Sequence, residues 1–274
     1  SFSFSLAPSR FSSSLPAYKT NKRDIVTIGK SLAGEFGFSG EPQIIEGIHK
    51  VYLWRSGNNT FSAQDYPFGI SLGMEVPTKG TLPSIQMAQA AVLAFVQKHH
   101  LVDPTIQLVP TGSSLLSTSG VNIDETTNLA PADRVAVSYQ YIMGGYPVFS
   151  QAGGRVGISA LIGPGGNIRS ISADILPPVS TQTNATLMSI DYATVALQNN
   201  KGVLVNIDRP TLSEASVADI SFSAVSITSV ELGYIVLDST NSIQPVYVFR
   251  GVAQNTSKDS EGAQVTYFVP AIIP

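Results

Sequence analysis

Residues 134–176 read RVAVSYQYIMGGYPVFSQAGGRVGISALIGPGGNIRSISADIL, and this stretch decides the fold class. Three β-rich runs are divided by two glycine-marked turns, and the runs contain very few charges. β-branched and aromatic residues favour strands, and glycine supplies the backbone angles that tight turns need. The stretch therefore predicts a β-meander, which suits a scaffold or a recognition surface better than a catalytic centre.

Helices are predicted where apolar residues recur at spacings of three and four. The first spans residues 24–37, with Asp24 as N-cap and Gly37 as stop, the second spans 84 to 99 or 100, and the third spans about 184–199. The predicted core positions are Ile25, Ile28, Leu32 and Phe36 in the first helix, Ile85, Ala88, Val92, Phe95 and Val96 in the second, and Leu187, Tyr192, Val195 and Leu197 in the third.

Strands are predicted around these helices. They comprise 43–55 and 61–76, separated by a turn at 56–59, and later runs at 203–207, 218–224, 229–237, 243–253 and 263–269. The Ser/Thr/Gly-rich segment 111–122 is interpreted as an exposed loop. Apolar residues on both sides of the alternation in 246–250 indicate a sheet contacted on two faces.

Single helices between groups of antiparallel strands favour an α+β fold over a doubly wound parallel one. We expect tandem modules, each a single helix packed on an antiparallel β-meander. The expected divisions are an N-terminal β-arm at 1–23 and helix-plus-strand modules at 24–80, 81–179 and 180–274.

Composition limits the classes of function. Charged residues make up 13% of the chain, and the net charge is −3 without a cluster of Lys and Arg, so a nucleic-acid partner is not expected. The absence of Cys excludes disulfides and thiolate zinc sites. No apolar run is long enough for a transmembrane helix, and the start lacks the pattern of a signal peptide, so an exported form is expected to be processed or cut. The hydroxyl-rich, charge-poor surface predicts a place outside the cytoplasm: secreted, at the cell surface or in the envelope.

Two segments carry a family resemblance. They are VSYQYIMGGYPVFSQAGGRVGISALIGPGGNIRSISADI (137–175) and SVELGYIVLDSTNSIQPVYVFRGVA (229–253), the second followed by VTYFVPAI (265–272). These segments resemble propeptide and PepSY-type domains and extracytoplasmic regulatory proteins of the YycH and YycI kind, over about half of the chain. The resemblance implies a non-catalytic domain that binds another protein as inhibitor, chaperone or regulator. The chain departs from that pattern because it carries no attached protease and no kinase-contacting transmembrane helix, so no residue role is carried over.

The candidate metal ligands are His49, His99 and His100. A catalytic zinc needs three protein ligands, and adjacent histidines on a helix point about 100° apart. We interpret His99 and His100 as a solvated helix end, and we expect no metal site.

Other candidate catalytic groups also have ordinary interpretations. The serines show no G-x-S-x-G or S-x-x-K pattern. The carboxylate pairs Asp208 with Glu214 and Asp238 with Glu231 are read as solvated loop residues rather than a glycosidase pair. Residues 163–166, Gly-Pro-Gly-Gly, are predicted to form a hairpin turn, because no Lys-Ser or Lys-Thr follows as in a phosphate loop. No catalytic residue and no cofactor is expected.

The N-terminal SFSFSL alternates Phe2, Phe4 and Leu6 with serine, so these three side chains project from one face of a strand. This β-arm has three interpretations: an edge strand on its own domain, insertion into a neighbouring subunit, or a remnant with little order. The candidate N-glycosylation sites, each beginning N-x-[ST], are Asn58, Asn184 and Asn255.

These observations predict a non-enzymatic extracytoplasmic structural or interaction protein that self-assembles through the arm, as a homo-oligomer, or binds an envelope protein. The alternative is a PepSY-like or YycI-like regulatory or inhibitory domain that binds an envelope protease or sensor. A third alternative is a hydrolase of unrecognised type.

Overall fold

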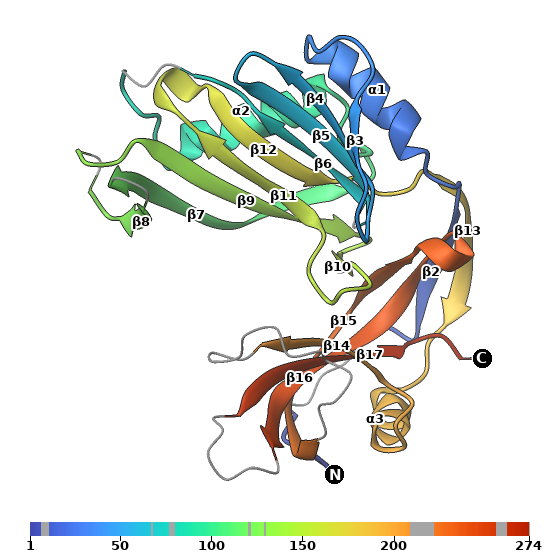
Figure 1. Ribbon diagram of the computed structural model, residues 1–274. Coiled ribbons are helices and arrows are strands. Elements are labelled where there is room, and N and C mark those ends of the chain that lie inside the picture. The colour runs from blue at the N-terminus through green and yellow to red at the C-terminus, as the bar shows by residue number, and fades with distance from the viewer. Residues whose placement is uncertain are drawn as a thin grey trace. The chain divides into compact units, whose positions relative to one another are not determined.

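The computed structural model of the chain describes residues 1–6, 11–66, 68–76, 80–119, 122–128, 130–208, 222–255 and 262–273. These residues form three α-helices and seventeen strands, in mixed but mainly antiparallel pairing (Figure 1). The fold class is α+β, mostly β, as predicted. The chain forms two compact units: unit 1 comprises residues 1–21, 145–155 and 179–274, and unit 2 comprises residues 22–144 and 156–178.

Unit 2 is an antiparallel sheet with both of its helices on one face. The strand order is β3 (Gln43–Ile45), β4 (Val51–Ser56), β5 (Asn59–Asp65), β6 (Phe68–Gly73), β12 (Ile168–Asp174), β11 (Gly157–Ile162), β9 (Arg134–Met143), β7 (Gln107–Ser119) and β8 (Asn122–Thr126). Helix α1 (Ile25–Glu35) packs on β4 and β5, and α2 (Ile85–Lys98) packs on β9. The predicted meander is confirmed for β9, β11 and β12.

Each of the two helices of unit 2 begins at an N-cap residue whose side-chain oxygen accepts hydrogen bonds from the first backbone N–H groups. Asp24 Oδ1 accepts hydrogen bonds from the backbone N–H groups of Val26 and Thr27, at 3.1 and 3.2 Å, and Ser84 Oγ accepts one from Met87 N–H at 3.2 Å. Gly37, two residues beyond the end of α1, has φ +82°. The predicted N-cap Asp24 and the predicted stop near Gly37 are confirmed.

Unit 1 is built around the long hairpin of β15 (Phe222–Leu237) and β16 (Ser242–Asn255). On the β16 side follow β17 (Ala263–Pro270) and then β14 (Val203–Asp208). On the outer side of β15, β1 (Phe2–Phe4) and β10 (Tyr146–Phe149) pair in parallel. Strand β2 (Ser14–Thr20) pairs with the first residues of β16, β13 (Val179–Thr186) pairs with β2, and α3 (Ile190–Gln198) packs on β17.

Both faces of this sheet are contacted, as the alternation in 246–250 predicts. Val246 and Val248 pack with Phe149 and Phe268 on one face. On the other face, Tyr247 Oη donates a hydrogen bond of 2.8 Å to the carbonyl oxygen of Met188.

Segment 111–122 is not the predicted exposed loop. Most of it lies in β7, which pairs with β9 and then with β8. The prediction was wrong because polar composition is local information, whereas the backbone partners of this segment come from a strand far along the chain.

The third helix is shorter than predicted, and of its four predicted core residues Leu187 and Leu197 are buried while the other two are exposed. It begins at Ile190, where Ser189 Oγ accepts a hydrogen bond from Tyr192 N–H at 3.2 Å. Tyr192 and Val195, predicted as core, are 58% and 51% exposed, while the side chains that face the sheet are Ala193, Ala196 and Leu197. Contact between α3 and β17 therefore buries small side chains and leaves the larger Tyr192 and Val195 exposed.

The predicted divisions of the chain do not coincide with the two units. Residues 24–80 lie in unit 2 and 180–274 in unit 1, while 1–23 and 81–179 contribute to both. The glycine-marked segment 145–155, inside the predicted meander, belongs to unit 1 and supplies β10. The predicted strand 218–224 lies outside the described residues up to 221, and Phe222 onwards begins β15. The module boundaries themselves stay a prediction. None of the described helices has the length and hydropathy of a membrane span.

Candidate functional site

The helix-end histidines are placed differently from each other. His99 is 8% exposed, with its Nδ1 atom 2.5 Å from Glu35 Oε1 and its ring centroid 4.3 Å from that of Phe95. The predicted solvated helix end is therefore wrong for His99, because the end of α2 packs against the end of α1. His49 and His100 are exposed. The described residues contain no group of three or more His, Asp or Glu side chains arranged to hold a metal ion.

The candidate carboxylate pairs do not assemble within the described residues. Glu231 of β15 lies between Arg155, at 3.1 Å, and Arg250, at 2.9 Å. Asp238 is in the turn after β15, roughly 23 Å further along an extended strand. Glu214, the expected partner of Asp208, lies outside the described residues.

Residues 163–166 form the predicted hairpin turn between β11 and β12. The N–H of Gly163 donates to the carbonyl oxygen of Asn167 at 2.8 Å, and that of Gly166 donates to the carbonyl oxygen of Gly163 at 3.2 Å. Gly165 and Gly166 have φ +72° and +77°, which only glycine adopts without strain.

The candidate glycosylation residues lie on strands and turns. Asn58 is in the exposed turn between β4 and β5, and its Nδ2 donates a 3.1 Å hydrogen bond to Glu75 Oε2. Asn184 is exposed in β13, and Asn255 ends β16. Modification of any of the three stays a prediction.

The N-terminal arm is an edge strand on its own unit in this chain. β1 pairs in parallel with residues 225–227 of β15, and Ser5 N–H donates to the carbonyl oxygen of Ile227 at 2.9 Å. The ring of Phe2 packs edge-on against Tyr267 at 5.4 Å, and the ring of Phe4 packs against Phe249 at 6.4 Å. Phe2, Phe4 and Leu6 are half-buried, and their role in assembly between chains stays a prediction.

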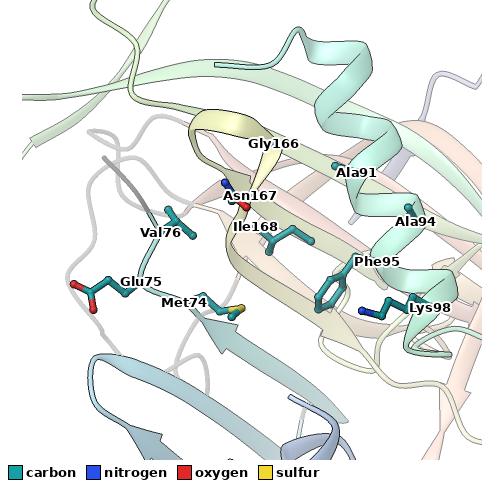
Figure 2. A pocket seen from close by; sticks show the side chains of 10 residues that line it. All are labelled: Met74, Glu75, Val76, Ala91, Ala94, Phe95, Lys98, Gly166, Asn167 and Ile168. Atoms are coloured by element: carbon teal, nitrogen blue, oxygen red, sulfur yellow. The ribbon is translucent and has the colours of Figure 1, made fainter. Parts of the chain in front are cut away.

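A groove of about 440 Å³ runs beside α2, at the ends of β6 and β12 (Figure 2). Met74, Phe95 and Ile168 give it an apolar floor, with Lys98 on the helix side. Figure 2 shows Glu75 on the opposite side, pointing away from the helix. The volume suits a small ligand. Its lining residues include no Ser, Thr, His or Cys.

The face of the unit 2 sheet opposite its two helices carries a row of serines that sequence reasoning missed. One serine from each of five neighbouring strands occupies the same position in the ladder: Ser62, Ser71, Ser172, Ser159 and Ser138. The Oγ atoms of Ser71 and Ser172 are 3.1 Å apart. The signal in the sequence is a repeated triplet of apolar residue, serine and apolar residue, as in Ile171-Ser172-Ala173. The row explains how a charge-poor sheet keeps one face hydrated.

The sheet edges differ in how well they are protected against strand addition. Natural edge strands are kept short, charged or proline-bearing, because their free N–H and C=O groups attract other strands. β3 and β1 have three residues each, β8 contains Asp124 and Glu125, and β14 contains Asp208. β13, with sequence VSTQTNAT, has eight residues and no charge, proline or glycine, and it is exposed along almost its whole length.

The β2–β13 ladder shows which backbone groups of β13 point outward. Leu187 N–H donates to the carbonyl oxygen of Ser13 at 2.9 Å, so Leu187 faces β2. Hydrogen-bonded and non-bonded pairs alternate in antiparallel ladders, so Ala185, Thr183 and Thr181 also face β2. Gln182 and Asn184 therefore present their N–H and C=O groups to the outside, where no described strand pairs with them.

The same ladder marks the ends of this free edge. Ile273 N–H donates to the carbonyl oxygen of Thr186 at 3.3 Å, so residues after 185 already have a partner. At the other end the pairing with β2 shifts between Val179 and Thr181. The regular free edge thus comprises residues 181–185, which we call the β13 edge.

Comparisons with known proteins assign no family. No protein-family model matches the chain, and no curated protein matches it. Among solved structures, the chain is similar to an uncharacterized protein from Eubacterium rectale, at 10% sequence identity and a TM-score of 0.49, with 95% of this chain and 84% of that chain covered. The resemblance to PepSY-type and YycI-like proteins stays a prediction.

Proposed function

We propose that this protein works outside the cytoplasm as a non-enzymatic interaction protein, and that it binds another polypeptide by accepting a strand at the β13 edge. The observation that carries the proposal is the exposed eight-residue strand Val179–Thr186, which has no charge and no proline. Strand addition takes its affinity from main-chain hydrogen bonds and therefore needs outward N–H and C=O groups. Gln182 and Asn184 supply them.

Composition supports the extracytoplasmic part of the proposal. Charged residues are 13% of the chain, about half of the usual share for a soluble domain. Hydroxyl side chains hydrate the surface in place of charged ones, as in the serine row of unit 2. Such a surface suits contact with other proteins or the outside medium.

A regulatory protein of the PepSY or YycI kind is the alternative, and it would use the same edge with an envelope protease or sensor as partner. A second route to assembly uses the arm. β1 is a short terminal strand, and a second copy offers Phe2, Phe4 and Leu6 the same contacts that they make here, so the arm can be exchanged between two copies.

We also propose that the chain is a series of tandem modules of one plan. The order of elements supports this: α1 precedes β3 to β6, α2 precedes β7 to β12, and α3 precedes β14 to β17. Each helix packs on strands that follow it in the chain.

A displayed library of eight-residue peptides tests strand addition without knowledge of the partner. Peptides selected on the whole protein are expected to bind the Asn184→Ala variant, which keeps its N–H, and to lose binding to Asn184→Pro, which lacks it. Selected peptides that bind both variants equally would show that the β13 edge is not the site, and so would a selection that yields no binder.

A further inference from the structure

We infer that the strand accepted at the β13 edge is the β13 edge of a second copy of this chain, paired antiparallel about a two-fold axis at Thr183. The inference rests on the proposed function and names its partner. Three features of the edge support it: its symmetry, its lack of charge and its cross-strand pairs.

The free edge is symmetric about Thr183. It begins at Thr181, after the shift in the β2 ladder, and ends at Ala185, because the carbonyl oxygen of Thr186 accepts from Ile273. A two-fold axis at Thr183 pairs every residue of the edge with one of the second copy. It also brings the outward groups of Gln182 opposite those of Asn184 of the partner subunit, which makes four main-chain hydrogen bonds across the axis.

Charge favours this edge over the acidic edges β8 and β14 for self-pairing. In a symmetric antiparallel pair each strand meets its own sequence, so a charged strand meets its own charge, and like charges directly opposite are destabilising. Self-pairing of β8 centred between its acidic residues would set Asp124 against Glu125 of the partner subunit. β13 contains no charged residue, so its self-pairing brings no repulsion within the strand.

The side chains that meet across the axis are compatible. Thr183 meets Thr183 of the partner subunit at a non-hydrogen-bonded position, where cross-strand side chains lie closest and threonine pairs are favourable. Gln182 meets Asn184 of the partner subunit, and two amides can exchange hydrogen bonds. The result joins two β2–β13 ribbons into four strands, a number that stabilises a ribbon better than two.

The contact is small, so the association is expected to depend on concentration. Sedimentation of the whole protein, made in a host that does not glycosylate Asn184, tests it. The mass is expected to rise from that of one chain, 29.0 kDa, towards twice that value as concentration increases. Asn184→Pro is expected to remain one chain at every concentration. Asn184→Ala, which loses the side-chain amide but keeps the N–H, is expected to reach the two-chain mass, at a somewhat higher concentration than the wild type.

A charge pair at the axis gives the second arm of the test. Thr183→Lys and Thr183→Glu alone are each expected to sediment as one chain, and their equimolar mixture is expected to recover the two-chain mass. Recovery in the mixture also shows that both variants are folded.

Two results would overturn the inference. One is a wild type that stays a single chain at all concentrations. The other is a two-chain species that the Pro, Lys and Glu variants leave unchanged, which would place the contact elsewhere, for example at residues 1–6. If peptides from the displayed library still depend on the Asn184 N–H in that case, strand addition stands and only the identity of the partner fails.

Discussion

Asn184 of β13 lies directly opposite Pro16 of β2 in an antiparallel ladder. Proline has no N–H to donate, and the ladder tolerates it because this pair is one in which neither residue bonds to the other across the strands. The same geometry turns the N–H and C=O of Asn184 outward. The position of Pro16 in β2 thus indicates which backbone N–H and C=O groups of β13 point away from β2.

Proline substitutions in β13 are expected to differ sharply between adjacent positions. Thr183→Pro removes an N–H that faces β2 and breaks a ladder hydrogen bond, so the loss in free energy of unfolding is expected to be roughly 1–3 kcal/mol. Asn184→Pro removes an outward N–H and is expected to cost clearly less. Urea unfolding of both variants measures the difference. Equal losses would mean that the alternation along β13 is the reverse of the one described.

The same glycine-to-alanine change is expected to have opposite effects at two positions of α1. A Cβ at Gly34 meets no atom within 4 Å, so Gly34→Ala is expected to stabilise by about 0.5–1 kcal/mol through helix propensity. A Cβ at Gly29 would lie 2.9 Å from Ala63 Cβ and 3.1 Å from the Trp54 ring, so Gly29→Ala is expected to destabilise by about 1–3 kcal/mol. Thermal unfolding checks both signs. Stabilisation by both variants would contradict the close packing of α1 on β4 and β5.

Loss of Glu35 is expected to destabilise unit 2 because His99 then keeps a buried nitrogen without its partner. Glu35→Ala removes the acceptor 2.5 Å from His99 Nδ1, and an unsatisfied buried polar group costs about 1–3 kcal/mol. Glu41→Ala is the control: Glu41 is 80% exposed and pairs with Lys30, so its removal is expected to cost less than about 1 kcal/mol. Comparable losses in the free energy of unfolding from the two variants would indicate that the Glu35–His99 contact stabilises the protein no more than an exposed ion pair does.

Stability is expected to fall with acid through Asp133. The Arg134 guanidinium, whose Nε donates to Asp133 Oδ1 at 2.6 Å, lowers the pKa of Asp133 from 3.8 to about 2. Because the pKa is lower in the folded state than in the unfolded state, the stabilising contribution is complete above about pH 4 and is lost as the pH falls towards 2.

Asp133→Asn isolates this contribution from that of other carboxylates. The difference in free energy of unfolding between wild type and variant is expected to be largest near pH 6 and to shrink below pH 4. Partial exposure of Asp133 predicts that high salt weakens the effect. A difference that stays constant from pH 6 to 2 would contradict the pairing of Asp133 with Arg134.

The accuracy of the sequence predictions follows the range of the interactions involved. Asp24, Ser84 and the 163–166 turn were predicted correctly because caps and tight turns act within a few residues. The buried face of α3 was predicted only in part, because Tyr192 and Val195 have the spacing of core residues while the buried side chains of the helix are Ala193, Ala196 and Leu197. His99 was assigned to solvent because the sequence does not show that Glu35 ends a helix beside it.

The candidate site shows the same division. The alternating SFSFSL arm is visible in the sequence, and its pairing with β15 is not. The β13 edge was missed because Asn184 was assigned to a helix. The strand is recognised only through β2, whose Lys19 and Ala17 carbonyl oxygens accept hydrogen bonds from the Ser180 and Thr183 side chains across more than 160 positions of sequence.

By itself, the amino-acid sequence determined the α+β class, the starts of the first two helices, the glycine turns and the low charge, since each depends on residue type and near neighbours. Only the tertiary structure decided which strands lie at an edge, which serines share a row and which backbone groups face outward. All three depend on strands that come from distant parts of the chain. Whether a backbone N–H or C=O group is free can be known only when the positions of all neighbouring strands are known.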